Sequence, residues 1–354
     1  MRRTGVVSLP LHEGRCPSWV FPRMVQLCRE ISKIVLLEYP VEQFLKRLSN
    51  PFFFQALGCV LGFDWHSSGL TTTTCAALKE ALNSENLGVK VAGGKGSASK
   101  KTPEEIMSLA TCDVERLVYA SRLSAKVDNA LVQDGYQLYH HTIVFSEDGS
   151  WTVIQQGLNP ENGYARRYHW LSTREVKLES FVEEPHQAIC CDRRGETLDL
   201  TSKRSREARE VSLDLVKDDP KHLEKYLTGQ TSLVDFHLPR SHLIPRMGER
   251  CLKTLRRVYE AQPRTYEELV SFKGVGPKTV RALALISKLI YGAELSWVDP
   301  AEYSFAHGGK DGVPYPVSVA LMEESAQMLK QAVEEARIGV KDKLHALRRL
   351  KTLV

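Results

Sequence analysis

The sequence lacks several features that would assign it to a class at once. None of its eight cysteines stands in a C-x-x-C pair, so a zinc site or a disulfide framework is not expected and a reducing cytoplasm is favoured. No apolar run follows the basic start Met1-Arg2-Arg3, so no signal peptide is expected. The longest apolar block, residues 51–63, is shorter than the roughly 20 residues that a membrane span needs. These absences predict a cytoplasmic protein without a membrane segment.

Familiar phosphate and metal motifs are missing as well. The glycine-rich stretch 92–101 is not a Walker A loop, because Gly96 follows Gly94-Lys95 and the upstream glycine is misplaced. No paired-carboxylate motif fixes a two-metal site. The cofactor is therefore unknown: a divalent ion, Mg²⁺ or Mn²⁺, is compatible with the sequence, but no motif requires it. The sequence also shows no internal repeat and no low-complexity tract.

The composition is that of an ordinary globular protein with a mild excess of positive charge. The 354 residues suggest about two domains, with 42% hydrophobic and 26% charged residues. The net charge is +5 and the pI is about 8.7. This balance permits nucleic-acid binding but does not demand it.

The stretch 265–292 predicts a helix, a tight turn and a second helix. Thr265 and Glu268 have the spacing of a capping box, and Pro277 suits the first position of the second helix, which Gly292 ends. The glycines of the turn allow positive φ, and the exposed N–H groups with their basic neighbours suit a phosphate. The expected phosphate contacts are Lys273, Gly274, Gly276, Lys278, Thr279 and Arg281. The stretch resembles the helix-hairpin-helix motif, which grips the DNA backbone without reading bases; the alternative is a plain pair of helices that uses glycines.

Two further basic segments lie in the N-terminal half. Residues 92–101 form a flexible basic loop ahead of a helix, and Lys95, Ser97 and Lys100 are its candidate phosphate ligands. The segment 165–170 places Arg166 and Arg167 among aromatic residues, a pattern typical of nucleic-acid surfaces. The alternatives are a mobile surface loop in the first case and an edge strand with solvated arginines in the second.

Residues 136–145 and 151–156 predict a β-hairpin with a two-residue Asp148-Gly149 turn. This turn would place His141 opposite Gln156 and Thr142 opposite Gln155. His140 and His141 would then point to opposite faces of the sheet.

The fold expected from these patterns has two parts. Residues 1–185 form an α+β (or α/β) domain with a sheet that contains the β-hairpin, and residues 186–354 form an all-α domain with the helix-hairpin-helix. Helices are predicted over the following ranges: 23–37, 41–48, 113–133, 317–337 and 341–353.

Several strings together resemble the domain of unknown function 763 family, a prokaryotic family found mainly in thermophiles. They are WHSSG, VAGGKG, KVDNALVQDGYQLYHH, RRYHW, GVGPKT and FAHGGKDG, and they span nearly the whole chain. The resemblance implies a role on nucleic acids and, from a member of the family, a DNA nuclease activity. It supplies no set of catalytic residues, so the chemistry must be argued from the site.

The first functional hypothesis is a DNA-processing or repair nuclease. Its partner would be nucleic acid, with DNA favoured over RNA and single-stranded or damaged DNA preferred; the oligomeric state stays open. Histidine and aspartate can activate a nucleophile, and lysine, arginine or a metal can neutralise phosphoryl oxygens. The candidate catalytic residues are His66, Lys126, Asp128, His141 and Gln156.

Two other hypotheses remain open. A DNA glycosylase with lyase activity would use Lys278, which stands at the nucleophile position of helix-hairpin-helix glycosylases, together with Asp299. Asp299 lies a few residues later than the spacing of that family. A non-enzymatic DNA-binding protein would explain the turn at 273–276, but not the His, Lys and Asp residues gathered between 64 and 169.

Overall fold

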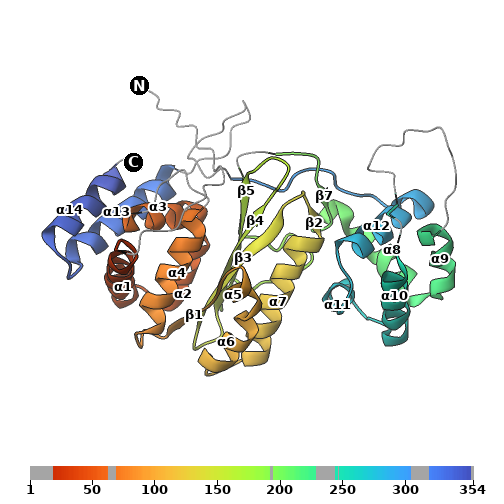
Figure 1. Ribbon diagram of the computed structural model, residues 1–354, viewed down its shortest axis with the longest axis horizontal. Helices are drawn as coiled ribbons and strands as arrows, with labels where there is room; N and C mark the ends of the chain where they lie inside the picture. Colours follow the sequence, from red (N-terminus) through yellow and green to blue (C-terminus); the bar gives the residue numbers. More distant parts are fainter. Residues whose placement is uncertain are drawn as a thin grey trace.

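A five-stranded antiparallel sheet forms the centre of the structure, a computed structural model that describes residues 19–62, 69–191, 194–228, 244–245, 247–303 and 319–351 (Figure 1). The strands follow the order β1-β3-β4-β5-β6. Their bounds are Val89–Lys95 (β1), Gln137–Ser146 (β3), Trp151–Leu158 (β4), Ala165–Ser172 (β5) and Ala188–Cys191 (β6). Every neighbouring pair is antiparallel, so the fold is of the α+β class and the α/β alternative is wrong.

The turn between β3 and β4 has three residues, not the predicted two. Phe145 pairs with Trp151, and the N–H of Ser146 donates to the carbonyl of Ser150 at 2.9 Å. Gly149 supplies the left-handed conformation, with φ 81°, that such a loop requires.

The extra loop residue moves the whole register of the hairpin by one. His140 lies opposite Gln156, and His141 lies opposite Gln155. The predicted pairs His141–Gln156 and Thr142–Gln155 are therefore wrong. The prediction that His140 and His141 face opposite ways still holds, because neighbouring strand residues alternate.

One face of the sheet is covered by helices from both ends of the chain (Figure 1). They are α1 (Phe21–Glu38), α2 (Val41–Ser49), α3 (Pro51–Leu61), α4 (Gly69–Asn83), α13 (Val319–Glu335) and α14 (Val340–Lys351). All residues of α3 are buried, and Asn50 caps its start by accepting from the N–H groups of Phe52 and Phe53. Near its end, Arg349 of α14 donates to the carbonyl of Val60 at 2.8 Å. The last helices thus complete the core that the first helices begin.

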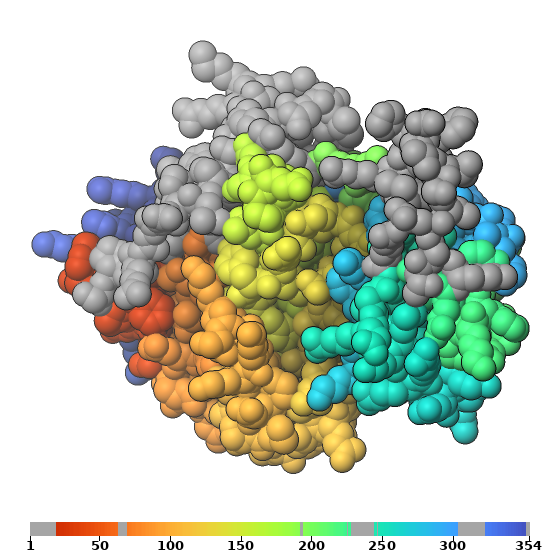
Figure 2. Space-filling view, turned by 45° about the vertical axis from the view of Figure 1, so that its right-hand side comes forward, coloured from red at the N-terminus to blue at the C-terminus, as the bar shows by residue number. Residues whose placement is uncertain are grey.

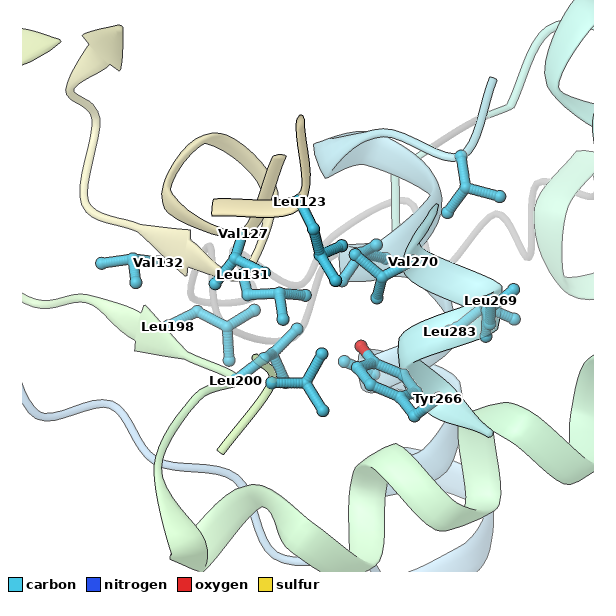
Figure 3. Close-up of a cluster of buried hydrophobic side chains, with 14 of the residues drawn as sticks. Leu123, Val127, Leu131, Val132, Leu198, Leu200, Tyr266, Leu269, Val270 and Leu283 are labelled. Atoms are coloured by element: carbon cyan, nitrogen blue, oxygen red, sulfur yellow. The ribbon is translucent and has the colours of Figure 1, made fainter. Parts of the chain in front are cut away.

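The other face is covered by the middle of the chain. Helices α5 (Ser97–Lys100), α6 (Thr102–Leu109) and α7 (Val114–Ala130) precede β2 (Val132–Gln133), which pairs with β7 (Leu198–Asp199). A helical body follows, made of η1 (Lys203–Ser205), α8 (Arg206–Lys217), α9 (Pro220–Thr228), α10 (Glu249–Ala261), α11 (Tyr266–Ser271) and α12 (Pro277–Tyr291). Figure 3 shows the apolar core that joins them: Leu123 and Val127 of α7 lie with Tyr266, Leu269 and Val270 of α11.

The predicted helices agree with the structure to within three residues at each end. The helix predicted over 113–133 ends at Ala130, because Val132 and Gln133 pair with β7. The predicted domain boundary lies at residues 185/186. Strand β6 follows that boundary in sequence but belongs to the central sheet, and α13 and α14 follow it but pack on the N-terminal helices. No helix of the described residues is long and apolar enough to cross a membrane.

A buried ion-pair group fastens the central sheet to the segment that follows α12. The guanidinium of Arg166, on β5, contacts Asp134 at 2.8 Å and Asp299 at 2.6 Å, and all three side chains are at most 4% exposed. The carboxylate of Asp299 also accepts from the N–H groups of Gly195 and Ala301. Arg166, an expected phosphate ligand, is therefore enclosed by protein and held by two carboxylates.

We expect Asp299→Ala to lower the free energy of unfolding by about 3 kcal/mol, because a guanidinium that loses a buried partner is costly. Glu294→Ala is the matched control, since its pair with Arg204 is exposed and contributes less than about 1 kcal/mol. Urea denaturation measures both values. Equal losses in the two variants would show that Arg166 does not depend on Asp299.

Candidate functional site

Polar side chains gather on both faces of the sheet, at the end where β3 begins. His140 and His141 start the two groups, because they follow one another on β3 and point to opposite faces. We call the group on the α7 face the relay, formed by Ser121, His141, Gln155 and Asp128. We call the group on the other face the polar row, formed by Lys95, His140, Gln156, Arg167 and Cys190.

The relay is a continuous chain of hydrogen bonds beneath α7. Ser121 Oγ lies 2.8 Å from His141 Nε2, and His141 Nδ1 lies 2.9 Å from Gln155 Oε1. The amide nitrogen of Gln155 donates to Asp128 Oδ2 at 2.5 Å. All four side chains are buried, so each depends on its partner for hydrogen bonding.

The direction of these bonds assigns the proton of His141. Asp128 can only accept from the amide nitrogen of Gln155, which turns the amide oxygen toward His141. His141 must then carry its proton on Nδ1, leaving Nε2 to accept the hydroxyl proton of Ser121. A hydroxyl that donates to a neutral imidazole, oriented from behind by a third group, is the arrangement of an activated nucleophile.

Asp128 anchors the inner end of the relay. Its carboxylate also accepts from Trp170 Nε1 at 3.0 Å and lies 2.5 Å from His186 Nε2. Burial raises the pKa of Asp128, and the nearby His186 and its hydrogen bond oppose that rise. His186 lines a second cavity of about 340 Å³ with Asp199 and Glu302, so its contact with Asp128 connects the relay to that cavity.

The outer end of the relay opens into a cavity of about 420 Å³. Ser121 and His141 line it together with Lys100, Arg122 and Tyr139. Lys100 and Arg122 are exposed, so their charges stand at the entrance while Ser121 and His141 lie deeper. In Figure 2 the gold and yellow segments around residues 100–140 share one face of the molecule with the teal helices α10 and α11.

The polar row crosses all five strands. The register pairs Lys95 with His140, His140 with Gln156, Gln156 with Arg167, and Arg167 with Cys190. A bulge in β3 between Leu138 and His140 brings Tyr139 to the same side, where the amide of Gln156 donates to its hydroxyl. The row is buried against α3 and α4, and only Lys95 is exposed.

The turn between α11 and α12 lies against the end of α7. Lys126 of α7 donates to the carbonyl of Phe272 at 2.5 Å, and Gln133 donates to the carbonyl of Pro277 at 3.0 Å. Burial lowers the pKa of Lys126 to about 8. Lys126, an expected catalytic residue, therefore holds the turn.

The predicted capping of these two helices is confirmed. Thr265 accepts from the N–H of Glu268 at 3.1 Å, Pro277 opens α12, and Gly292 ends it with φ 78°. Gly274 has φ 102°, and a side chain there would lie 2.9 Å from Thr254 Oγ1 of α10.

The basic residues of the turn differ in their exposure. Lys273, Gly274 and Lys278 are exposed, whereas Thr279 is buried. Gly276 is half-buried with extended backbone, and Arg281 is half-buried over the ring of Trp297.

The other expected site residues are spread over both faces. Asp128 and His141 belong to the relay, and Lys100 lines its cavity. Lys95, Gln156 and Arg167 belong to the polar row, while Ser97 is exposed at the start of α5. The expected catalytic residue His66 lies outside the described residues, as do the strings WHSSG and FAHGGKDG in large part.

Ser121, Arg122, Gln155 and His186 were not among the expected site residues. Ser121 and Asp128 lie seven residues apart on α7, two helical turns, so helical spacing alone could have paired them. Gln155 depends on the hairpin register, and no sequence feature joins His186 to Asp128. Among the described residues, no three His, Cys, Asp or Glu side chains stand close enough to hold a metal ion.

The buried histidines make stability depend on pH. Burial lowers the pKa of His141 to about 4 and that of His140 to about 3. The unfolded chain therefore takes up protons below about pH 6.5 that the folded protein does not bind until about pH 4 at His141 and about pH 3 at His140. Stability contributed by these groups is present above pH 6.5 and is lost as the pH falls toward 4.

We expect the free energy of unfolding to fall less between pH 6.5 and 4 in His141→Gln than in the wild type. The control is His222→Gln, because His222 is exposed on α9. Denaturation at several pH values measures the slopes. Identical slopes in the wild type and His141→Gln would contradict a buried, neutral His141.

Comparison with known proteins identifies the family of this chain. No curated protein and no solved structure matches it. The profile of one protein family, described as "Protein of unknown function (DUF763)", matches residues 5–317, which is most of the chain. The protein belongs to the DUF763 family.

Proposed function

We propose that the protein is a nuclease that processes DNA by hydrolysing phosphodiester bonds at the relay. The observation that carries the proposal is the hydrogen bond between Ser121 and His141 at the bottom of a basic cavity. It combines a nucleophile, a base and a group that orients the base. Lys100 and Arg122 supply the positive charge that a phosphodiester requires.

The reaction follows from the protonation of the relay. Ser121 Oγ attacks the phosphorus while its proton moves to His141 Nε2, and the bond from phosphorus to the leaving nucleoside oxygen breaks. The leaving oxygen takes the proton from His141. Water then attacks the phosphorus of the Ser121–nucleotide phosphodiester and gives its proton to His141 Nε2. The bond from phosphorus to Ser121 Oγ breaks, Oγ takes the proton from His141, and the strand leaves as a phosphate monoester.

Substrate binding adjusts the basicity of His141. In the structure burial lowers its pKa to about 4, which keeps the imidazole neutral and ready to accept a proton. An anionic phosphate held by Lys100 and Arg122 stabilises the imidazolium and raises the pKa toward neutrality, where a general base works best. Gln155 and Asp128 keep Nε2 aimed at Ser121 throughout.

The turn between α11 and α12 supports DNA as the substrate. Lys273 and Lys278 are exposed beside the turn, and the start of α12 adds unpaired N–H groups with partial positive charge. This arrangement supports a helix-hairpin-helix that grips the backbone of single-stranded or damaged DNA. Lys126 couples the grip to the relay, because it lies on the same helix as Ser121 and Asp128.

The glycosylase and lyase alternative is less well supported. It needs the carboxylate of Asp299 beside the sugar that Lys278 attacks. In the structure that carboxylate is buried and bound by Arg166, Gly195 and Ala301. A carboxylate enclosed by these partners is poorly placed to assist an exposed lysine.

We expect Ser121→Ala and His141→Gln each to reduce cleavage of end-labelled oligonucleotides by at least about 100-fold. DNA affinity should stay near the wild-type value, because neither side chain stands at the entrance of the cavity. Ser124→Ala is the matched control: Ser124 is buried one turn further along α7 and donates to the carbonyl of Ser121. A nucleotide joined to Ser121 through a phosphodiester in stopped reactions, identified by mass spectrometry, tests the covalent step.

The same assay separates the alternative functions. Normal and abasic oligonucleotides, each in single-stranded and double-stranded form, are incubated with magnesium or with EDTA. Cleavage only at the abasic site, with a borohydride-trapped adduct that Lys278→Ala removes, would replace the nuclease by a lyase. Salt-sensitive DNA binding without any cleavage product would support a non-enzymatic DNA-binding protein.

We expect the double variant Lys273→Gln, Lys278→Gln to bind DNA of every sequence more weakly. The slope of log affinity against log salt should fall by about 2, one unit for each phosphate contact. Lys33→Gln is the control. Lys33 pairs with Glu85 and lies on α1, which covers the face of the sheet opposite the turn. An unchanged salt slope in the double variant would exclude the turn from the DNA interface.

A further inference from the structure

A third cavity lies at the turn between β3 and β4, and the proposed nuclease mechanism does not use it. Its volume is about 270 Å³. Arg116 of α7, Ser150 beside the turn and Arg174 after β5 all line it, so three separate parts of the chain form one site. None of its lining residues lines the relay cavity. Pockets for drug-sized ligands measure about 300–1,000 Å³, so this cavity suits a small group.

Three buried hydroxyl groups form the inner wall of this cavity. They belong to Ser150, Ser172 and Thr173, which are at most 6% exposed. Ser172 Oγ accepts from the N–H of Leu178 at 3.4 Å, and Thr173 Oγ1 accepts from the N–H of Val176 at 3.0 Å. A hydroxyl that accepts one hydrogen bond still has its own proton to donate. The inner wall therefore offers donors to a ligand.

Ser150 presents a buried hydroxyl that forms no hydrogen bond with the described residues. The nearby carboxylate of Asp148 is already engaged, because it accepts from the backbone N–H of Ser150 at 3.0 Å and from the hydroxyl of Ser146. Partial burial acts to raise the pKa of Asp148, but these donors and the proximity of the Ser150 hydroxyl lower it. A ligand oxygen that accepts from Ser150 Oγ would supply the missing hydrogen bond.

Three cations line the cavity against one carboxylate. Arg116, Arg174 and Lys177 are exposed, so their charges stand toward the solvent while the hydroxyl groups lie deeper. Within the described part of the chain, neither Arg116 nor Lys177 forms an ion pair. Arg174 contacts Asp148 through Nε at 3.2 Å, which leaves the other two nitrogens of its guanidinium to bind a ligand. The cavity therefore combines an excess of positive charge with an excess of donors.

We propose that this cavity binds a phosphate-class oxyanion, held by Arg116, Arg174 and Lys177 and accepting from the buried hydroxyl groups. Every oxygen of such an anion accepts hydrogen bonds, which matches a wall of donors whose one carboxylate is engaged. Its three or four oxygens can also use more of these donors than the two oxygens of a carboxylate. The inference does not rest on the proposed nuclease function, because the site shares no residue with the relay cavity.

Calorimetric titration of the whole protein with inorganic phosphate, at constant ionic strength, tests the site. Lys177→Gln should weaken phosphate binding about tenfold, because a charge-assisted hydrogen bond is lost. Lys330→Gln removes another exposed lysine, on α13, and should bind phosphate as the wild type does. Equal weakening in both variants would contradict a specific site. Weakening in Lys100→Gln but not in Lys177→Gln would put the anion in the relay cavity and overturn the proposal.

Ser150→Ala tests whether the anion reaches the buried hydroxyl groups. Phosphate binding should weaken at least about fivefold. The thermal unfolding midpoint without phosphate should stay near the wild-type value, because the lost hydroxyl forms no hydrogen bond with the described residues. Wild-type affinity in this variant would confine the anion to the exposed cations and overturn the proposed site. Acetate should bind far more weakly than phosphate, and equal affinities would contradict a phosphate-class ligand.

Competition against inorganic phosphate identifies the source of the oxyanion. Displacement by an oligonucleotide with a 5′-phosphate, but not by its 5′-hydroxyl counterpart, would identify the terminal phosphate of a strand. Displacement by both would identify a backbone phosphate. If neither oligonucleotide displaces phosphate while Lys177→Gln still weakens its binding, the ligand is free phosphate or a small phosphate ester.

Discussion

The three-residue turn between β3 and β4 fixes the register in which these strands pair. Both the relay and the polar row depend on that register. Side chains alternate along a strand, so a slip of one residue would exchange the two faces. His141 and Gln155 would leave α7, and His140 and Gln156 would leave α3 and α4. The left-handed Gly149 holds the turn, and Asp113, at the start of α7, lies 3.0 Å from where a side chain on Gly149 would be. The turn therefore sets the register, and it lies against the start of α7.

Helices on both faces explain how so many polar groups can be buried near one end of a sheet. Water is excluded from either side, so each polar group must find its partner within the protein. In a medium of low polarity such hydrogen bonds are strong, but a missing partner is costly. The relay is satisfied along its whole length, whereas His140 Nδ1 of the polar row has no hydrogen-bond partner among the described residues. The two groups therefore differ in how fully the described residues satisfy their hydrogen bonds.

Local features were well predicted from the sequence, and long-range pairings were not. Thr265, Pro277 and Gly292 mark the ends of α11 and α12 because capping depends on neighbouring residues. Asp128 and His141 were predicted as site residues, but Gln155, whose amide joins them, was not. Its position opposite His141 follows from a register that a single loop residue shifts. Arg166 and Arg167 looked like a solvent-exposed basic pair. No sequence feature indicates that the carboxylates of Asp134 and Asp299 enclose Arg166. Nor does any feature indicate that helices cover Arg167.

The return of α13 and α14 to the N-terminal helices also bears on how the protein is made. Leu329, Val333 and Leu350 belong to the same core as Leu27, Phe53 and Leu78, although nearly the whole chain separates them. The ribosome delivers α1–α4 first, but the surface they present stays open until α13 and α14 have been synthesised. The middle of the chain, whose core is built from residues 92–301, can assemble earlier. The core formed by α1–α4 is thus completed only after the middle of the chain has been made.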